Sequence, residues 1–117
     1  MLMSPLSAVA QLNDAFRRAP LFTGPRPPGR VLITRGIALL PVEQQLAIVT
    51  GVQQFDAFTP SNDPHKEHDF GKFAHDGLDV IWKVDYYADA SCTYGSDNPA
   101  DPTASYRVLT IMRAEEY

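Results

Sequence analysis

The chain has 117 residues, of which 44% are hydrophobic and 21% are charged, a balance typical of one soluble globular domain over residues 1–117. An ordinary hydrophobic content and a single cysteine, Cys92, exclude disordered, fibrous and disulfide-rich proteins. The formal net charge of -4 hides two opposite halves. Residues 1–55 carry five arginines against two acids, a net of +3, and residues 56–101 carry three lysines against ten acids, a net of -7.

The acidic half argues against direct nucleic-acid binding and suits a cation or a basic protein partner, although ordinary surface solvation explains it as well. The lone cysteine and the start of the chain, which has neither a basic region nor a long apolar run, predict a cytoplasmic protein. No stretch approaches the roughly 20 apolar residues of a membrane helix. A monomer and a small homo-oligomer fit equally well.

The first third of the chain predicts a helix, a connector and a strand. Ser4 and Pro5 are a helix start signal, and apolar residues recur at helical spacing from there to about Arg18. Residues 20–29 are rich in proline and glycine and predict a connector. The β-branched run that begins at Arg30 predicts a short strand.

A second helix is predicted from about Pro41 to Phe55, with polar glutamate and glutamine residues on one side. Its apolar side is predicted to comprise Val42, Leu46, Val49, Val52 and Phe55.

Residues 71–87 predict a hairpin, because Asp76-Gly77 is a preferred turn pair and the residues after it alternate in polarity. A loop over residues 88–104 leads to a last strand, Tyr106 to Ala114, whose two apolar faces suit a central position. The order helix, strand, helix, strand, strand, strand predicts an α+β fold, with a four-stranded, largely antiparallel sheet and two helices on one face.

The first candidate site is the loop that contains His65, Glu67, His68 and Asp69. Imidazole and carboxylate groups are the usual ligands of zinc and similar metals, so His65, His68 and Asp69 could hold one ion if the loop curls. Asp79, Asp85 or His75 could complete the ligand set. A histidine paired with Glu67 could instead act as a general base, and a plain polar loop without ligand also fits the pattern.

The second candidate site is one face of the strand after the turn. Alternation places Asp79, Lys83, Asp85 and Tyr87 opposite the Trp82 side, together with Ile81. If the helices cover the Trp82 side, this face stays open, and its mixture of charged, aromatic and apolar groups is typical of an interaction surface. An ordinary solvated face with cross-strand charge pairs is the alternative.

Several segments over nearly the whole chain share the pattern of one family: residues 12–17, 34–36, 62–65, 67–71, 82–87, 98–102 and 107–112. They resemble the small bacterial family catalogued as domain of unknown function 3768. The resemblance implies no activity, and it implies a setting on plasmids and other mobile elements, where a small acidic protein could inhibit a host defence system of the restriction or CRISPR type. Lys66 stands where this family commonly has glycine.

Two functions follow as expectations. The first is a small acidic, non-enzymatic module, without a cofactor, that binds a macromolecular protein partner through the acidic loop and the open strand face. The second is a metal-dependent hydrolase or metal-binding protein built on His65, His68 and Asp69. No serine stands in a nucleophile-elbow sequence, which weighs against a hydrolase of the serine class.

Overall fold

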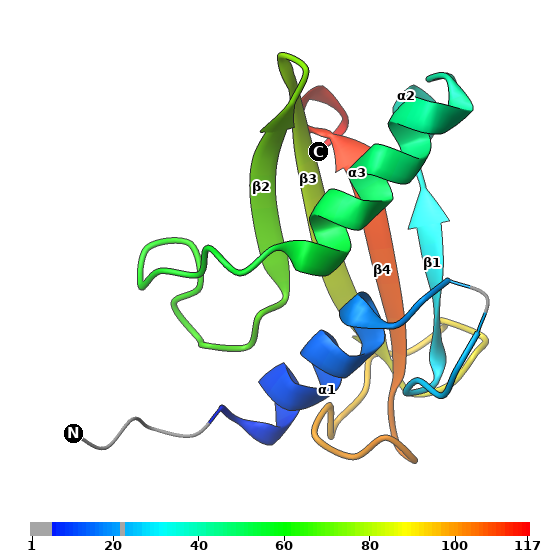
Figure 1. Ribbon diagram of the computed structural model, residues 1–117. Helices are drawn as coiled ribbons and strands as arrows, with labels where there is room; N and C mark the ends of the chain where they lie inside the picture. The colour runs from blue at the N-terminus through cyan, green and yellow to red at the C-terminus, as the bar shows by residue number, and fades with distance from the viewer. Residues whose placement is uncertain (1–5, 22) are drawn as a thin grey trace.

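In the described part of the chain, four strands form one sheet, and three α-helices and a C-terminal 3-10 helix pack with it (Figure 1). The structure is a computed structural model that describes residues 6–21 and 23–117. The elements are α1 (Ala8–Arg18), β1 (Gly29–Ile33), α2 (Arg35–Ala38), α3 (Val42–Gln54), β2 (Phe70–His75), β3 (Leu78–Tyr87), β4 (Tyr106–Arg113) and the 3-10 helix (Ala114–Glu116).

The strand order is β1-β4-β3-β2, so β1 and β2 are the two edges and β4 is central. The β2–β3 and β3–β4 pairs are antiparallel, whereas β1 pairs with β4 in parallel. The predicted α+β fold with a largely antiparallel, four-stranded sheet is therefore confirmed. The short α2, which follows β1 directly, is the helix that the sequence pattern did not indicate.

The β2–β3 hairpin forms where the sequence predicts it. Asp76 and Gly77 both have positive φ angles, 48° and 77°, as the preferred two-residue hairpin turn requires. His75 pairs with Leu78 on either side of this turn, and the register continues to Phe70 and Lys83.

The core lies between the sheet and the helices on its Trp82 face, the arrangement that Figure 1 shows for α1 and α3. Trp82 is fully buried and packs in a cluster that includes Phe16 of α1 and Val52 of α3. Its indole crosses the neighbouring strand at Gly71, where a Cβ atom would stand 2.3 Å from the Trp82 Nε1 atom. A glycine is required there because no side chain leaves room for the indole.

The apolar side predicted for the second helix is wrong in its first half. Val42 and Leu46 of α3 are 65% and 56% exposed, and the buried residues of this helix are Ile48 and Val52. Apolar residues occupy several sides of α3, so their periodicity alone could not determine which side faces the sheet. The result is an exposed apolar strip at the start of α3.

Helix α1 begins later than predicted. Its N-cap is Ser7, whose Oγ accepts a hydrogen bond of 3.1 Å from the Ala10 backbone N–H, and the proposed start at Ser4 and Pro5 lies outside the described residues. The buried side of α1 includes two polar residues, Asn13 and Arg17. No helix in the described residues is long and apolar enough to cross a membrane.

The sheet face opposite the helices is only partly open. Ile81, Val108 and Met112 at its centre are buried, and the ring of Tyr117 lies 6.0 Å from that of Phe70 in an edge-to-face contact. The C-terminal 3-10 helix contacts β3 and thereby covers part of this face. The expectation of an open strand face therefore needs correction, since its apolar centre is covered and its polar residues surround that centre.

Candidate functional site

The loop between α3 and β2 (residues 55–69) is held in one shape by Asp63. The buried Asp63 carboxylate accepts backbone hydrogen bonds from Glu67 at 3.1 Å and His68 at 3.2 Å through Oδ1. Lys66 and His68 have positive φ angles of 56° and 55°, a left-handed conformation that costs energy for any residue with a Cβ atom. A glycine at position 66 would adopt this conformation more easily.

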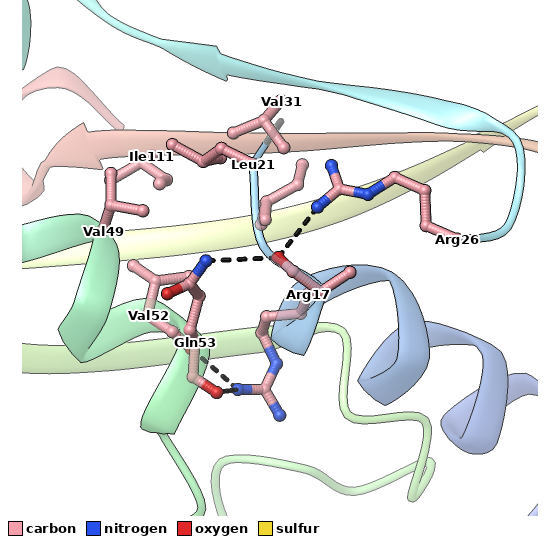
Figure 2. Close-up of a pocket in the computed structure, with 10 residues that line it drawn as sticks. Arg17, Leu21, Arg26, Val31, Val49, Val52, Gln53 and Ile111 are labelled. Atoms are coloured by element: carbon pink, nitrogen blue, oxygen red, sulfur yellow. Dashed lines mark hydrogen bonds between the residues drawn. The ribbon is translucent and has the colours of Figure 1, made fainter. Parts of the chain in front are cut away.

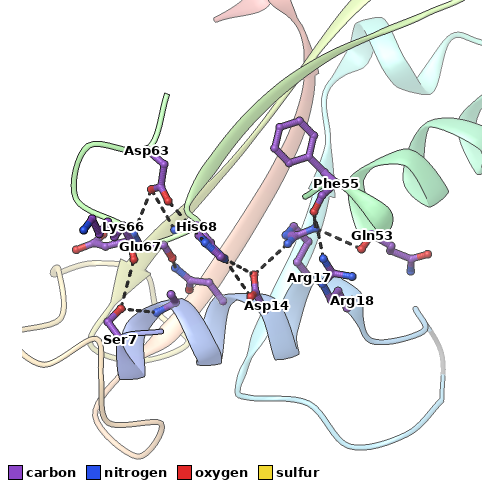
Figure 3. A network of polar contacts seen from close by, with 12 residues as sticks. Ser7, Asp14, Arg17, Arg18, Gln53, Phe55, Asp63, Lys66, Glu67 and His68 are labelled. Atoms are coloured by element: carbon purple, nitrogen blue, oxygen red, sulfur yellow. Dashed lines mark hydrogen bonds and ion pairs between the residues drawn. The ribbon is translucent and has the colours of Figure 1, made fainter. Parts of the chain in front are cut away.

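Hydrogen bonds from α1 and its N-cap residue also hold the same loop. The Ser7 Oγ donates to the carbonyl oxygen of Lys66 at 3.4 Å, and the Asn13 Nδ2 donates to that of Glu67 at 2.9 Å. The loop is thus attached to α1 at two successive carbonyl groups (Figure 3).

The His68 ring is fixed from three sides. Its Nδ1 lies 3.0 Å from both carboxylate oxygens of Asp14, and its Nε2 lies 3.7 Å from an Asp63 oxygen (Figure 3). The ring also stacks on Phe58 with a centroid separation of 3.8 Å and an angle of 4° between the planes. An imidazole between two carboxylates is oriented by both, so its ring position is determined by the fold rather than by a ligand.

Asp14 connects this histidine to a buried arginine. The Arg17 Nη2 donates to Asp14 at 3.0 Å, and its Nη1 donates to the carbonyl oxygens of Val52 at 2.7 Å and Phe55 at 2.9 Å, at the end of α3. The guanidinium lies 4.8 Å from the Trp82 ring centre. Burial lowers the pKa of Arg17, although the Asp14 hydrogen bond opposes this shift. The arginine closes the C-terminal end of α3, where carbonyl groups need donors.

A second buried polar network lies beneath the loop. The Asn13 Oδ1 accepts from Arg107 Nε at 2.7 Å, and the Asn13 Nδ2 donates to the Tyr86 hydroxyl at 2.7 Å. Tyr86 in turn donates to Glu67 Oε2 at 3.1 Å. Burial is the main cause that raises the pKa of Tyr86, with the nearby Glu67 and Asp69 charges adding to it, so the hydroxyl stays protonated. Glu67 is therefore engaged on the inner side of the loop.

A groove of about 540 Å³ opens between this loop and the start of α1. Its apolar walls come from Leu6, Phe58, Pro60 and Pro64, and polar groups surround them. The polar lining residues are Ser7, Thr59, Asp63, His65, Lys66 and His68. In the following, "loop groove" refers to this feature.

A much smaller cavity of about 10 Å³ lies between α1, α3 and the sheet (Figure 2). Beside it, Gln53 and Arg26 both donate to the Ala19 carbonyl oxygen, at 3.2 Å and 2.8 Å. The volume is about that of one water molecule, so this cavity belongs to the packing of the core and holds no larger ligand.

The predicted loop residues do not come together as a metal site. In the part of the chain that the structure describes, no group of three His, Cys, Asp or Glu side chains could hold an ion. His65 and His68 both line the loop groove, whereas Asp69 does not. Burial raises the pKa of Asp69, and the charges of Glu67 and Asp63 add to this effect. Under the metal hypothesis for His65, His68 and Asp69, His68 would bind the ion through Nε2, which now faces Asp63, because metal-bound histidines commonly donate their other ring N–H to a carboxylate and Asp14 occupies Nδ1.

The predicted strand-face residues form a separate group on the other side of the sheet. Lys83 and Asp85 make an ion pair of 2.7 Å, and this partner raises the pKa of Lys83. Asp79 is exposed, and Tyr87 is half-buried. The sheet therefore separates this group from the loop groove, and the two predicted sites do not make one surface.

Sequence reasoning missed four residues that organise the loop: Asn13, Asp14, Phe58 and Arg107. One signal was available, because Asn13 and Arg17 are polar residues four apart on the side of α1 that also carries Ala10 and Phe16. Polar residues on a buried side require partners, so this spacing indicates a polar network under α1. Their partners could not be identified from the sequence.

Comparison with family models matches residues 33–116 to the family described as Protein of unknown function (DUF3768). The match spans the loop, α2, α3 and strands β2 to β4, and it begins after α1. No curated protein and no solved structure matches the chain.

Proposed function

Since the chain belongs to this family, which has no described activity, we propose from the geometry that it is a non-enzymatic protein-binding module that uses the loop groove. The observation that carries this proposal is the rigid attachment of the loop. Asp63 holds its backbone, Asp14 and Phe58 hold His68, and α1 holds two of its carbonyl groups. A loop ordered before binding loses little conformational entropy when a partner arrives, and this favours affinity.

The lining of the loop groove fits a polypeptide. Phe58, Pro60, Pro64 and Leu6 offer an apolar floor of the size that side chains of a partner can fill. His65 and Lys66 are exposed at its edge and supply hydrogen-bond donors or acceptors. An apolar centre with a polar edge is the usual composition of a protein interface.

The arrangement lacks the parts of a nucleophilic enzyme. The Asp14–His68 contact resembles a base with its orienting carboxylate, but the other ring nitrogen of His68 faces Asp63. Of the groove hydroxyls, Ser7 Oγ contacts Ala10 and Lys66, and Thr59 Oγ1 contacts Ser61 and Asn62. Among the described residues, neither hydroxyl hydrogen-bonds to His68, so no activated nucleophile is assembled.

The class of partner is proposed from the family resemblance and the charge distribution. A mobile-element protein that inhibits a host defence system would bind a protein that itself binds DNA or RNA, and such proteins present basic surfaces to an acidic ligand. The ten acids of residues 56–101 suit such a partner. The strand-face residues Asp79, Lys83, Asp85 and Tyr87 are a second proposed contact surface for it.

Affinity capture with matched variants tests the proposal. We expect His65→Trp, which places a bulky side chain at the edge of the loop groove, to lose the protein partner that the wild type captures from its host cells. Ala47→Trp places the same side chain at an exposed position of α3, outside the loop groove and off the strand face, and should keep the partner. Equal capture by both variants, with unchanged thermal unfolding, would exclude the loop groove as the binding site.

Two further variants separate the alternatives. Asp79→Lys/Asp85→Lys should weaken capture if the strand face contributes, and unchanged capture would remove that face. For the metal hypothesis, the measurement is the metal content of untagged protein beside that of His65→Ala/His68→Ala. Stoichiometric metal in the wild type and its loss in the variant would favour the metal-dependent function over the binding module.

A further inference from the structure

The edge of the sheet formed by β1 has unused backbone hydrogen-bonding groups. Arg107 N–H donates to the Pro28 carbonyl, and Thr34 N–H donates to the Ile111 carbonyl, so the even-numbered residues of this strand direct their backbone groups toward β4. The N–H and C=O groups of Gly29, Val31 and Ile33 therefore point away from the sheet. Within residues 6–21 and 23–117, no hydrogen bond to these outward groups is present.

An apolar groove of about 590 Å³ runs between this edge and α3. It is distinct from the loop groove, since β1 and β2 lie at opposite edges of the sheet and the loop leads into β2. Ile33 and Leu46 on its two sides are 39% and 56% exposed. The lining residues are Leu21, Arg26, Gly29, Arg30, Val31, Ile33, Gln45, Leu46 and Val49. In the following, "edge groove" refers to this feature.

The two faces of β1 differ in chemistry. Val31 and Ile33 pair with Leu109 and Ile111, which belong to the core, so their side chains point toward α3. Arg30 and Leu32 point to the opposite face. A strand added beside β1 would thus meet apolar side chains on one face and an exposed arginine on the other.

The positive charge beside the edge groove favours a partner that is negatively charged. Arg26 and Arg30 are among its lining residues, Arg30 with its side chain on the opposite face of β1, and none of the lining residues is acidic. Arg35, two residues after the end of β1, is exposed. A second copy of this chain, paired through the same edge, would bring these positive charges together, which disfavours it.

We propose that β1 binds an extended segment of a partner protein by strand addition, and that this segment alternates apolar and acidic residues. The apolar residues lie in the edge groove against Val31, Ile33 and Leu46, and the acidic residues lie beside Arg30. Backbone hydrogen bonds to the outward groups of Gly29, Val31 and Ile33 hold the segment, as in other cases of strand addition. This inference does not rest on the loop groove.

A labelled peptide that alternates valine and glutamate is the probe, and fluorescence anisotropy measures its binding. We expect saturable binding whose affinity is lower by ~10-fold or more in Leu46→Asp. In this variant, the leucine contact that the peptide would bury is lost, and a charge of the same sign as that of glutamate is added. Ala47→Asp adds the same charge at the next position of α3, exposed and outside the edge groove, and should bind as the wild type does. A peptide with lysine in place of glutamate should not bind.

Val31→Pro is a second test variant, which changes only the edge of β1 that does not pair with β4. It removes an N–H group that β4 does not use, and proline is tolerated on an edge strand whose N–H faces solvent. The variant should keep the fold and lose the peptide. In the wild type, the bound peptide should slow hydrogen exchange at the Val31 and Ile33 amides.

Three results would overturn the inference. One is equal binding of the glutamate and lysine peptides, or no binding of either. Another is a loss of peptide affinity in Leu46→Asp that is equally large in Ala47→Asp. The third is a dimer of the free protein, measured by sedimentation, that Val31→Pro abolishes, since a second copy would then be the occupant. Each of these leaves the loop groove and its His65→Trp test unaffected.

Discussion

Replacing Arg17 by methionine tests whether the buried guanidinium stabilises the junction between α1 and α3. Methionine keeps most of the volume of the side chain and removes its charge and its donors. The variant leaves the carbonyl oxygen of Val52 without its 2.7 Å side-chain donor, and Phe55 retains a contact of 3.3 Å from Arg18. Asp14 keeps its contact with His68.

The expected loss follows from these contacts. Among the described residues, four hydrogen bonds of 2.7 Å, 2.9 Å, 3.0 Å and 3.3 Å involve the guanidinium, and bonds to charged groups contribute about 1.5–3 kcal/mol each. Burial of the charge opposes this gain, because the Arg17 Nε is buried and has no partner among the described residues. Removing one member of such a network costs about 3–5 kcal/mol, and we expect a value at the lower end because the desolvation cost is also removed.

Arg18→Met is the matched control for this change. Arg18 is exposed and makes one contact of 3.3 Å to the Phe55 carbonyl oxygen, so its loss should cost less than about 1 kcal/mol. Urea unfolding of wild type and both variants, with equal m-values, gives the two differences. An Arg17→Met variant no less stable than Arg18→Met would refute the reasoning, because the desolvation cost would then equal the whole gain from the contacts.

The loop yields two more predictions. Lys66→Gly should raise the free energy of unfolding by about 1 kcal/mol, since the left-handed backbone at φ 56° suits glycine. The control Lys72→Gly, in the extended strand β2, should lower it. Urea unfolding measures both values, and a loss of stability in Lys66→Gly as large as that in Lys72→Gly contradicts the prediction for Lys66. For Asp69, burial and the nearby acids raise the pKa in the folded state, so the unfolded chain loses the proton at lower pH and stability falls as pH rises from the ordinary pKa to the raised one. Asp69→Asn should therefore match the wild type near about pH 3 and exceed its stability near about pH 7, and a variant that is less stable at both values is inconsistent with this sign.

Local patterns in the sequence were sufficient for the hairpin and for the fold class. The turn at Asp76-Gly77 needs only the backbone preferences of those two residues, and the alternation after it places Trp82 on the core side without further information. The four strands followed from such local signals, and a largely antiparallel sheet with two helices on one face followed from their order.

Features that depend on distant contacts could not be predicted in the same way. The parallel pairing of β1 with β4 is set by packing of segments far apart in the sequence. His68 meets Asp14 across 54 positions, and Arg107 meets Asn13 across 94. On α3, the exposure of Val42 and Leu46 depends on how the helix crosses the sheet, which its own apolar residues do not specify.

The two proposed binding surfaces can be separated by experiment because the sheet keeps them apart. The loop groove lies at the β2 side and the edge groove at the β1 side, with β3 and β4 between these edges. Substitutions that share no contacts and lie far apart usually have additive effects. If one partner protein occupies both grooves, His65→Trp and Leu46→Asp should each weaken its capture, and their combination should weaken it by more than either alone. If two different partners bind, each variant should lose only one of them, and the double variant should lose both.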